Sequence, residues 1–282
     1  MAFARDAQRV SRVSKKTPRA AIRRLDNDAY GTRITCIPVE STMHIKDSVA
    51  LVTGANRGIG RALVEALLEH GASRIYAAAR DLASLDTIVR LDPKRVHALK
   101  LDVTSAEDTR AAAARATDVT LLINNAAVLA TGRFTDIPVD AVRGNMETNF
   151  FGLLTVTNGF VPILERNEGS IVNILTLLSL ASMPGVAAYN ASKAAGWSLT
   201  QSFRADLAKR GIRVHGVFPG LVDTDMARPF QAPKAPAIDV ARAILGGVEA
   251  NEEDIYPDPM AEQVYAAWRE DHKAVERQFA AM

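Results

Sequence analysis

Two residues of the chain have the types and the spacing of an acid–base pair. Tyr189 and Lys193 lie four positions apart in the segment 187–195, which predicts the start of a helix. Residues four apart share one helix face, so the phenol and the ammonium would point into the same space. A cation favours the phenolate, so we expect the pKa of Tyr189 to fall below its usual value of about 10. The pair predicts a proton donor and acceptor, although solvated helix faces often carry the same spacing by chance.

A glycine-rich turn lies upstream, between an apolar run and an amphipathic segment. The run 49–53 ends at Gly54, and Gly58 and Gly60 follow in the pattern Gly-x-x-x-Gly-x-Gly. Gly54 would allow a sharp turn, Gly58 a close approach to a pyrophosphate, and Gly60 tight packing of helix on strand. The following helix would present free N–H groups to the phosphates. Strand, turn and helix together predict a dinucleotide-binding site.

Four spaced motifs resemble those of the short-chain dehydrogenase/reductase family, in its compact subgroup. They are Thr-Gly-Ala-Asn-Arg-Gly-Ile-Gly at 53–60, Asn-Asn-Ala-Ala at 124–127, Tyr-Asn-Ala-Ser-Lys at 189–193 and Pro-Gly at 219–220. The resemblance covers roughly residues 45–259. It implies an oxidoreductase in which Lys193 binds the nicotinamide ribose and the glycine turn, with Asn56, Arg57 and Ile59, binds the cofactor phosphates.

The resemblance also implies further cofactor contacts at the carboxyl edge of the sheet, where open α/β folds bind ligands. They are Asp102 and Val103 at the adenine, Asn125 at the ribose, Pro219 and Gly220 after the sixth strand, and Val222 and Thr224 at the nicotinamide carboxamide. Asp102 could instead be a simple turn residue. The family usually has glycine where this chain has Ala127, so alanine would be strained if that position needs a positive φ.

Two more residues complete the catalytic set that the resemblance implies. Asn149 would link Lys193 to solvent, and an asparagine within a helix predicts a local kink that holds a water there. A buried asparagine that caps a backbone group is the alternative. Thr176 stands thirteen residues before Tyr189, where the family has serine. Its hydroxyl has the same donor and acceptor capacity, with an added methyl group and a restricted χ1. We favour Thr176 over Ser179 as the residue that polarises the substrate.

The end of the second strand bears on the choice of cofactor. An acid there would bind the ribose 2′-hydroxyl of NAD, whereas an arginine accommodates the 2′-phosphate of NADP. Arg80 follows the strand 74–79, and Arg57 in the glycine turn offers a second cation. We interpret Asp81 as the cap of the helix 82–90. We therefore predict NADP(H) rather than NAD(H); the alternative is that both arginines are ordinary surface charges.

Composition excludes several other classes of protein. The chain has 282 residues, of which 48% are hydrophobic and 23% charged, as in ordinary globular proteins. It has no apolar run long enough to span a membrane. A single cysteine, Cys36, excludes an intramolecular disulfide and favours a cytoplasmic location, and the five histidines lack metal-ligand spacing. No nucleic-acid-binding module is recognisable. We expect neither a metal site nor a membrane or nucleic-acid partner.

The first 42 residues differ from the remainder. They carry nine Lys/Arg against four Asp/Glu and have little apolar periodicity, which predicts a disordered basic extension. An over-extended reading frame, with a start at Met43, is the explanation we favour. A targeting segment and a genuine basic arm are the alternatives, since the first 24 residues contain Asp6 as their one acid.

From residue 45 the pattern alternates short apolar runs with helical segments. This predicts βαβ units, and we expect 43–282 to form a single Rossmann-like, doubly wound α/β domain with a seven-stranded, mostly parallel sheet and helices on both faces. The strands are expected at 49–53, 74–79, 95–101, 119–124, 170–176, 212–218 and 253–256. The helices are expected at 58–70, 82–90, 105–116, 138–166 with a break, 187–210, 238–250 and 260–279.

The residues favour an NADP(H)-dependent enzyme that interconverts a carbonyl compound and an alcohol. A non-catalytic NADP(H)-binding sensor is the alternative, and a sugar-nucleotide epimerase or dehydratase would need a larger C-terminal domain. Residues 221–237, with three prolines, predict a flap over a modest apolar substrate. The helix 260–279 would pack on its own subunit or contact another. Helices like 138–166 and 187–210 form dimers or tetramers in the family, so we expect a homodimer or homotetramer.

Overall fold

Residues 43–282, which the structure describes, form an α/β fold around one sheet. In this computed structural model seven strands lie in the order β3-β2-β1-β4-β5-β6-β7, and every neighbouring pair is parallel. The predicted doubly wound fold is confirmed. The strands are β1 Val49–Thr53, β2 Arg74–Ala79, β3 Val96–Lys100, β4 Leu121–Asn124, β5 Ser170–Ile174, β6 Arg213–Val217 and β7 Asp254–Ile255.

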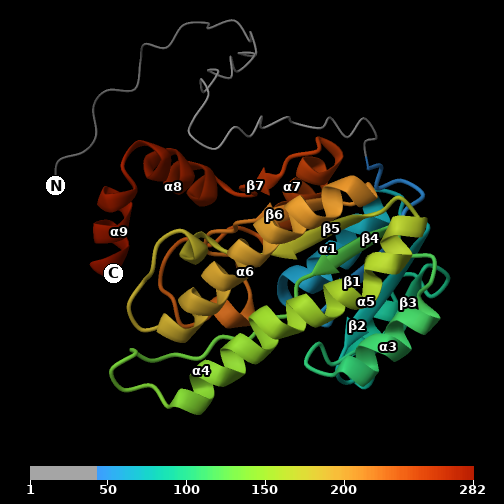
Figure 1. Cartoon of the computed structure of the whole chain (residues 1–282), viewed down its shortest axis with the longest axis horizontal. Coiled ribbons are helices and arrows are strands. Elements are labelled where there is room, and N and C mark those ends of the chain that lie inside the picture. Colours follow the sequence, from blue (N-terminus) through green and yellow to red (C-terminus); the bar gives the residue numbers. More distant parts are fainter. Residues whose placement is uncertain (1–42) are drawn as a thin grey trace, which may run out of the picture. The chain divides into compact units, whose positions relative to one another are not determined.

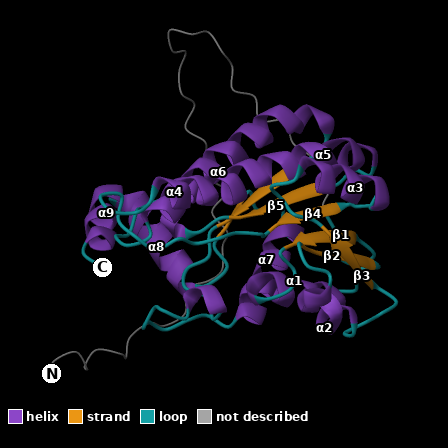
Figure 2. Ribbon diagram, turned by 90° about the horizontal axis from the view of Figure 1, so that it is seen from below, coloured by secondary structure: helices purple, strands orange, loops and turns teal. Residues whose placement is uncertain are grey.

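Helices cover both faces of the sheet, because each crossover between parallel strands carries one (Figure 1). Figure 2 shows α1, α2 and α7 on one side of the strands and α3, α5 and α6 on the other. The helices are α1 Gly58–Glu69, α2 Asp86–Val89, α3 Ala106–Arg115, α4 Val139–Met146, α5 Leu153–Arg166, α6 Ala187–Leu207, α7 Ala237–Glu249, α8 Pro259–Glu270 and α9 His272–Ala280.

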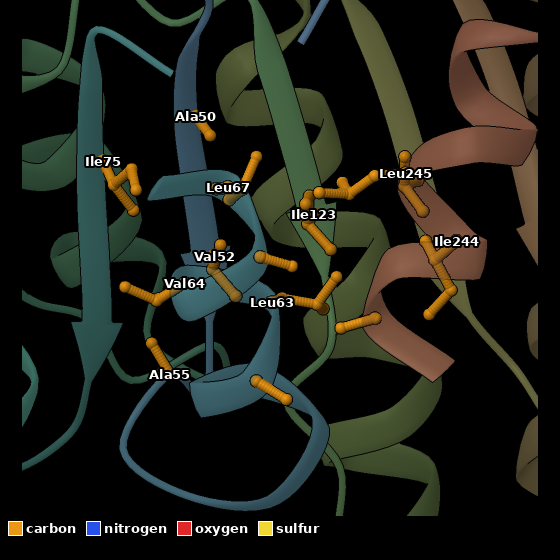
Figure 3. Close-up of a cluster of buried hydrophobic side chains, with 14 of the residues drawn as sticks. Ala50, Val52, Ala55, Leu63, Val64, Leu67, Ile75, Ile123, Ile244 and Leu245 are labelled. Carbon is orange, nitrogen blue, oxygen red and sulfur yellow. The ribbon is translucent and has the colours of Figure 1, made fainter. Parts of the chain in front are cut away.

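Alternation along the strands divides the hydrophobic core into two layers. Successive side chains of a strand point to opposite faces, so Val52 joins the cluster under α1 and α7, whereas Leu51 joins the cluster under α3, α5 and α6. Figure 3 shows the first cluster, where Leu63 of α1 and Ile244 of α7 lie against β1 and β4. These side chains are fully buried. The two layers hold the carboxyl ends of β1, β4, β5 and β6 along one edge.

Local signals in the sequence set several helix ends. The Ser105 hydroxyl accepts a hydrogen bond from the Asp108 N–H at 3.0 Å and caps α3. The expected helix 82–90 is a 3₁₀ turn, Ala83–Leu85, followed by the short helix α2, and neither has a side-chain cap at its N-terminus. Asp81 accepts a hydrogen bond from the Ala83 N–H at 3.0 Å just before this turn. Gly71 and Gly211, which follow helices, have positive φ of 81° and 72°.

Two predicted helices differ in detail from the structure. The segment 138–166 is not broken but contains a π-helical turn, Glu147–Gly152, between α4 and α5. The expected single helix 260–279 is two helices, because Asp271 leaves the helical conformation between them and its carboxylate caps α9 through the Ala274 N–H at 2.9 Å. Val275 and Phe279 are buried against Ala181 of the same chain, so α9 packs on its own subunit.

The predictions for residues 1–42 lie outside the described residues. Among residues 43–282, no helix combines the length and the apolar character needed to cross a membrane.

A buried histidine on β6 makes the fold sensitive to acid. Burial, with Arg213 and Arg204 nearby, lowers the pKa of His215 from 6.5 to about 4, while its Nδ1 lies 2.6 Å from the Glu252 carbonyl. The imidazole of His215 therefore binds a proton more tightly in the unfolded chain than in the folded one. As the pH drops from 6.5 to 4, the free energy of unfolding falls by about 3 kcal/mol.

We predict that His215→Asn, which keeps a donor for Glu252, flattens this pH dependence of the free energy of unfolding, as measured by urea titration at pH 4.5 and 7. His97→Asn, at a half-exposed site on β3, is the control and should leave it intact. An unchanged acid dependence in the His215 variant would contradict the assignment.

Candidate active site

The glycine turn between β1 and α1 has the conformation that its sequence predicts. Gly54 and Gly58 have positive φ of 65° and 54°, which residues with a Cβ rarely adopt. Gly60 is needed for space instead, because a Cβ there would lie 2.2 Å from the Gly54 carbonyl oxygen. The turn thus brings the start of α1 directly against the end of β1.

Side chains at the ends of β1 and β4 fix this turn. The Thr53 hydroxyl accepts hydrogen bonds from the N–H groups of Asn125 and Ala126 at 2.9 and 3.0 Å. The Asn125 amide donates to the carbonyls of Thr53 and Gly54 at 2.8 and 3.2 Å. Asn125 therefore holds the glycine turn in place, and its contact with a ribose stays a prediction. Ala127 does not have a positive φ, so alanine is not strained there.

The N-terminus of α1 is open to an anion. No side chain caps it at Arg57, and its first turn contains no acid. A pocket of about 420 Å³ lies beside it, lined by Gly58, Thr224 and Lys234 among others. Thr224 lies over the turn, since a Cβ on Gly58 would be 3.2 Å from its Cγ2. The open helix end and the glycine backbone fit the phosphates of a dinucleotide.

Charged side chains of both signs line this pocket: Arg61, Arg228 and Lys234, with Glu65, Asp223 and Asp225. Arg57 of the glycine turn and Arg80 after β2 are not among the lining residues. Arg57 and Arg80 are exposed, and neither makes an ion pair or a hydrogen bond within residues 43–282. Arg61 is paired with Glu65 at 2.9 Å. Lys234 of the flap lines the pocket without an ion pair in the described part of the chain. Lys234 has no recognisable signal in the sequence, because only the tertiary fold of residues 221–237 brings it to α1.

The two residues expected at the adenine have local partners. Asp102 accepts hydrogen bonds from the N–H and the hydroxyl of Thr104 at 3.0 and 2.8 Å, as the turn-residue alternative requires. Val103 is buried and packs on the π-helical turn, where a Cβ on Gly152 would lie 2.8 Å from its Cγ2. Their contacts with an adenine stay predictions. Asn56 and Ile59, the two other residues assigned to the glycine turn, are half-buried.

Tyr189 and Lys193 are buried side by side in the first two turns of α6. They are 8% and 4% exposed, and the Lys193 ammonium lies 5.8 Å from the centroid of the Tyr189 ring. Lys193 Nζ donates a hydrogen bond to the carbonyl oxygen of Ile174, the last residue of β5, at 2.6 Å. The Tyr189 hydroxyl has no hydrogen-bond partner among the described residues, so it is available to another molecule.

Burial acts on the two pKa values in opposite directions. It raises the pKa of Tyr189 above its usual value and lowers the pKa of Lys193 to about 8, because a low-dielectric interior disfavours both charged forms. Our expectation of a lowered tyrosine pKa is therefore wrong for this structure. At pH 7 a pKa of about 8 still leaves most of the lysine protonated.

Asn149 lies in the π-helical turn and joins three segments. Its Oδ1 accepts from the Val128 N–H, and its Nδ2 donates to the Val128 carbonyl and to the Ser192 hydroxyl, each at 2.9 Å. Ser192 in turn donates to the Tyr189 carbonyl at 2.8 Å. The predicted kink is present, and so is the alternative role of capping backbone groups. Asn149 and Lys193 also line one small cavity of about 10 Å³.

Thr176 lies just after β5 and contacts the segment after β6. Its Oγ1 accepts from the Leu178 N–H at 3.3 Å and donates to the Pro219 carbonyl at 3.4 Å. The structure thus brings Thr176 and Pro219 together. The Ser179 hydroxyl is buried without a partner among the described residues. Which of the two hydroxyls acts on a substrate stays a prediction.

The segment after β6 is held by a residue that the sequence did not identify. Asp258 accepts from the Gly220 N–H at 2.8 Å and also caps α8 through the Ala261 N–H at 2.9 Å. The Asp-Pro pair at 258–259 indicates a helix start, but its contact with Gly220 depends on the fold. Val222 is buried in the core cluster under α1 and α7, which fixes the base of the flap.

Residues 43–282 contain no cluster of side chains suited to a metal ion. No group of three or more His, Cys, Asp or Glu side chains in this part of the chain could hold an ion.

Comparison with known proteins agrees with this architecture. The sequence model of the family "short chain dehydrogenase" matches residues 48–235. An uncharacterized oxidoreductase of Staphylococcus aureus is 30% identical over 210 residues, which cover 71% of this chain and 90% of that protein.

Two solved structures are also similar. A short chain dehydrogenase from Burkholderia cenocepacia in complex with NADP has a TM-score of 0.79 and 37% identity, covering 84% of this chain and 99% of that one. A short chain dehydrogenase/reductase from Burkholderia phymatum in complex with NAD has a TM-score of 0.75 and 25% identity, covering 84% and 97%.

The fold and these comparisons together define an α/β oxidoreductase. The chain belongs to the short-chain dehydrogenase family.

Gly60 provides a test of the close contact at the turn. A Cβ in Gly60→Ala would lie 2.2 Å from the Gly54 oxygen and 2.6 Å from Asn125 Nδ2, so we predict a loss of about 1–3 kcal/mol in the free energy of unfolding. Gly246→Ala in α7, with nothing within 4 Å of the added Cβ, is the matched control and should be neutral or slightly stabilising. Equal melting temperatures for the two variants would argue against the close contact.

Proposed function

We propose that the protein is an NADP(H)-dependent oxidoreductase that interconverts an aldehyde or ketone and the corresponding alcohol. The observation that carries this proposal is the buried pair on α6, with Lys193 Nζ 5.8 Å from the centroid of the Tyr189 ring. The Tyr189 hydroxyl without a protein partner and the open end of α1 support it. A bound NADP(H) would supply or accept the hydride, and the protein supplies position and charge.

Tyr189 would hold and move the proton. In the reducing direction its Oη donates to the substrate oxygen, and in the oxidising direction it accepts that proton. Burial alone makes the phenolate unfavourable, so the ammonium of Lys193 would stabilise the negative charge that develops on the Tyr189 oxygen. This role requires Lys193 to stay protonated, which a pKa of about 8 allows at neutral pH.

Asn149 and Thr176 would complete the set. The cavity of about 10 Å³ shared by Asn149 and Lys193 is of the size that holds one water, which supports a path from Lys193 to solvent. Thr176 would donate its hydroxyl proton to the substrate oxygen. Its hydrogen bond with Pro219 is long, at 3.4 Å, so little is lost when that donor turns to a substrate.

Tyr189→Phe tests the assignment of the proton donor. We expect kcat with NADPH and a panel of aldehydes and ketones to fall by roughly 10²–10⁴-fold, because the ring stays and the transferable proton is lost. NADPH affinity, measured by fluorescence titration, should stay within about twofold. Tyr265→Phe, which removes a hydroxyl from α8, is the control.

The wild-type assay also separates the two functions that the sequence left open. Full activity in Tyr189→Phe would contradict the assignment of the proton donor. NADPH binding without turnover of any substrate would instead favour the non-catalytic sensor.

Two arginines carry the proposed preference for NADP(H). Arg57 and Arg80 are exposed beside the turn and unpaired within the described residues, so they are available for a 2′-phosphate. Asp81, the nearest acid after β2, accepts a hydrogen bond from the Ala83 N–H at 3.0 Å. Assembly as a homodimer or homotetramer and a cytoplasmic location stay predictions.

We predict that the double variant Arg57→Ala/Arg80→Ala raises the Kd for NADPH by about tenfold or more and changes the Kd for NADH little. Isothermal titration with both cofactors measures the ratio. Arg90→Ala, an exposed arginine beyond the short helix α2, is the control. An equal change in the two affinities would contradict the proposal, because it would mean that these arginines contact a group present in both NADPH and NADH.

A further inference from the structure

The segment between β5 and α6 joins Thr176, the proposed substrate-binding hydroxyl, to Tyr189, the proposed proton donor. Residues 177–186, which we call the substrate-side loop, connect Thr176 to the helix of Tyr189. One short 3₁₀ turn, Leu177–Ser179, is its regular structure, and Gly185 has a positive φ of 80°. A segment with so little internal hydrogen bonding needs contacts from outside to keep one conformation.

The C-terminal helix α9 supplies the first of these contacts. Val275 and Phe279 are 3% and 6% exposed and form one apolar cluster with Ala181 of the loop. The half-buried Leu178 and Met183 pack on the same cluster. The outer side of the loop is thus covered by a helix that lies about ninety residues further along the chain and belongs to no part of the sheet (Figure 1).

Asn190 supplies the second contact, from α6. Its Nδ2 donates a hydrogen bond to the Met183 carbonyl at 2.7 Å, and the side chain is 3% exposed. The same residue directly follows Tyr189, so the loop is tied to the helix turn that carries the proposed proton donor. Its Oδ1 is buried without a partner in the described part of the chain. A buried amide with one unmet acceptor is unfavourable, which makes a purely stabilising role a poor account of it.

A third contact comes from the loop before α4. The Gly132 N–H donates to the Gly185 carbonyl at 2.7 Å, and the Ala187 N–H donates to the Gly132 carbonyl at 3.3 Å, as a short parallel bridge between Gly132 and Val186. The substrate-side loop is therefore held by contacts with α9, with Asn190 of α6 and with Gly132.

The conformation of this loop determines where the Thr176 hydroxyl lies. The Leu178 N–H donates to Thr176 Oγ1 at 3.3 Å, and the Ser179 N–H donates to the Thr176 carbonyl at 2.9 Å. Leu178 also packs on the apolar cluster that Ala181 forms with Val275 and Phe279 of α9. The cluster that contains Phe279 therefore includes a neighbour of the Thr176 hydroxyl.

We propose that α9, through Phe279, and Asn190 are positioning elements that hold the substrate-side loop and thereby orient the Thr176 hydroxyl towards the substrate. The consequence for catalysis rests on the proposed function, whereas the effect on the loop does not. A displacement of about 1 Å at a reacting group can lower a rate a hundredfold, so loss of either contact should act on turnover without touching the cofactor.

The experiment compares Phe279→Ala and Asn190→Ala with matched controls on the same kind of surface. Gln278→Ala is an exposed neighbour on α9, and Asn158→Ala removes an exposed asparagine from α5. Hydrogen exchange measured by mass spectrometry should be about tenfold faster for residues 177–186 in both test variants, and unchanged for 49–60. In both controls the loop should exchange like the wild type. Unchanged exchange of the loop in the test variants would overturn the proposal.

Kinetics then test whether the loop acts through Thr176. We expect kcat to fall by about tenfold in both test variants, with the Kd for NADPH within about twofold of the wild type. In a Thr176→Val background, which has no hydroxyl to orient, the same substitutions should lower kcat by less than about threefold. Equal losses in the two backgrounds would overturn the link to Thr176.

Two further results have a defined meaning. If Phe279→Ala fails to fold, Asn190→Ala carries the same test. If the wild type turns over no carbonyl compound, the proposed function fails, whereas hydrogen exchange still decides whether α9 and Asn190 hold the loop.

Discussion

The buried ammonium of Lys193 is the constraint on which the site depends. Moving a charged amine out of water costs several kcal/mol unless hydrogen bonds replace its hydration, and the fall of its pKa to about 8 reflects that cost. The hydrogen bond to the Ile174 carbonyl, at 2.6 Å, joins the end of β5 to the second turn of α6. It therefore fixes the rotation of α6 against the sheet, and with it the direction in which Tyr189 points. A neutral side chain would pack there at less cost, and the proposed role beside Tyr189 gives a reason for a lysine at this position.

A buried network of hydrogen bonds joins α6 to β4, β5 and α5. Asn124 Nδ2 donates to the side-chain oxygen Oδ1 of Asn173 and to the Thr157 hydroxyl, at 2.9 and 3.0 Å, and Asn173 Nδ2 donates to the Thr200 hydroxyl of α6 at 3.0 Å. Each of these groups would be costly if left unpaired, so the network admits one arrangement of β4, β5, α5 and α6. The hydrophobic layers alone would tolerate small shifts between helices and sheet, whereas these hydrogen bonds would not.

The sequence predicted those features that depend on local geometry. Gly54 and Gly58 act through the backbone of their own turn, and the strand ranges follow from short apolar runs, which are typical of strands buried on both faces. Features that depend on tertiary contacts were missed or wrong. Neither the hydrogen bond of Asp258 with Gly220 nor that of Asn190 with Met183 has a signature in the chain. The pKa of Tyr189 was expected to fall because the spacing shows the neighbouring cation and does not show the burial.

The same distinction separates the two halves of the site. The half that fits a dinucleotide consists of main-chain groups at a helix end and in a glycine turn, which change little when surface side chains change. The other half consists of loops whose conformation depends on distant segments, such as α9. Thr176 lies where the halves meet, and its hydroxyl is located by the Leu178 N–H and the Pro219 carbonyl, both backbone groups. A serine there would meet the same two groups. Threonine in place of serine therefore leaves the hydroxyl where it is and adds a methyl to the space beside it, so under the proposed function the methyl would limit the shape of the substrate and leave the chemistry unchanged.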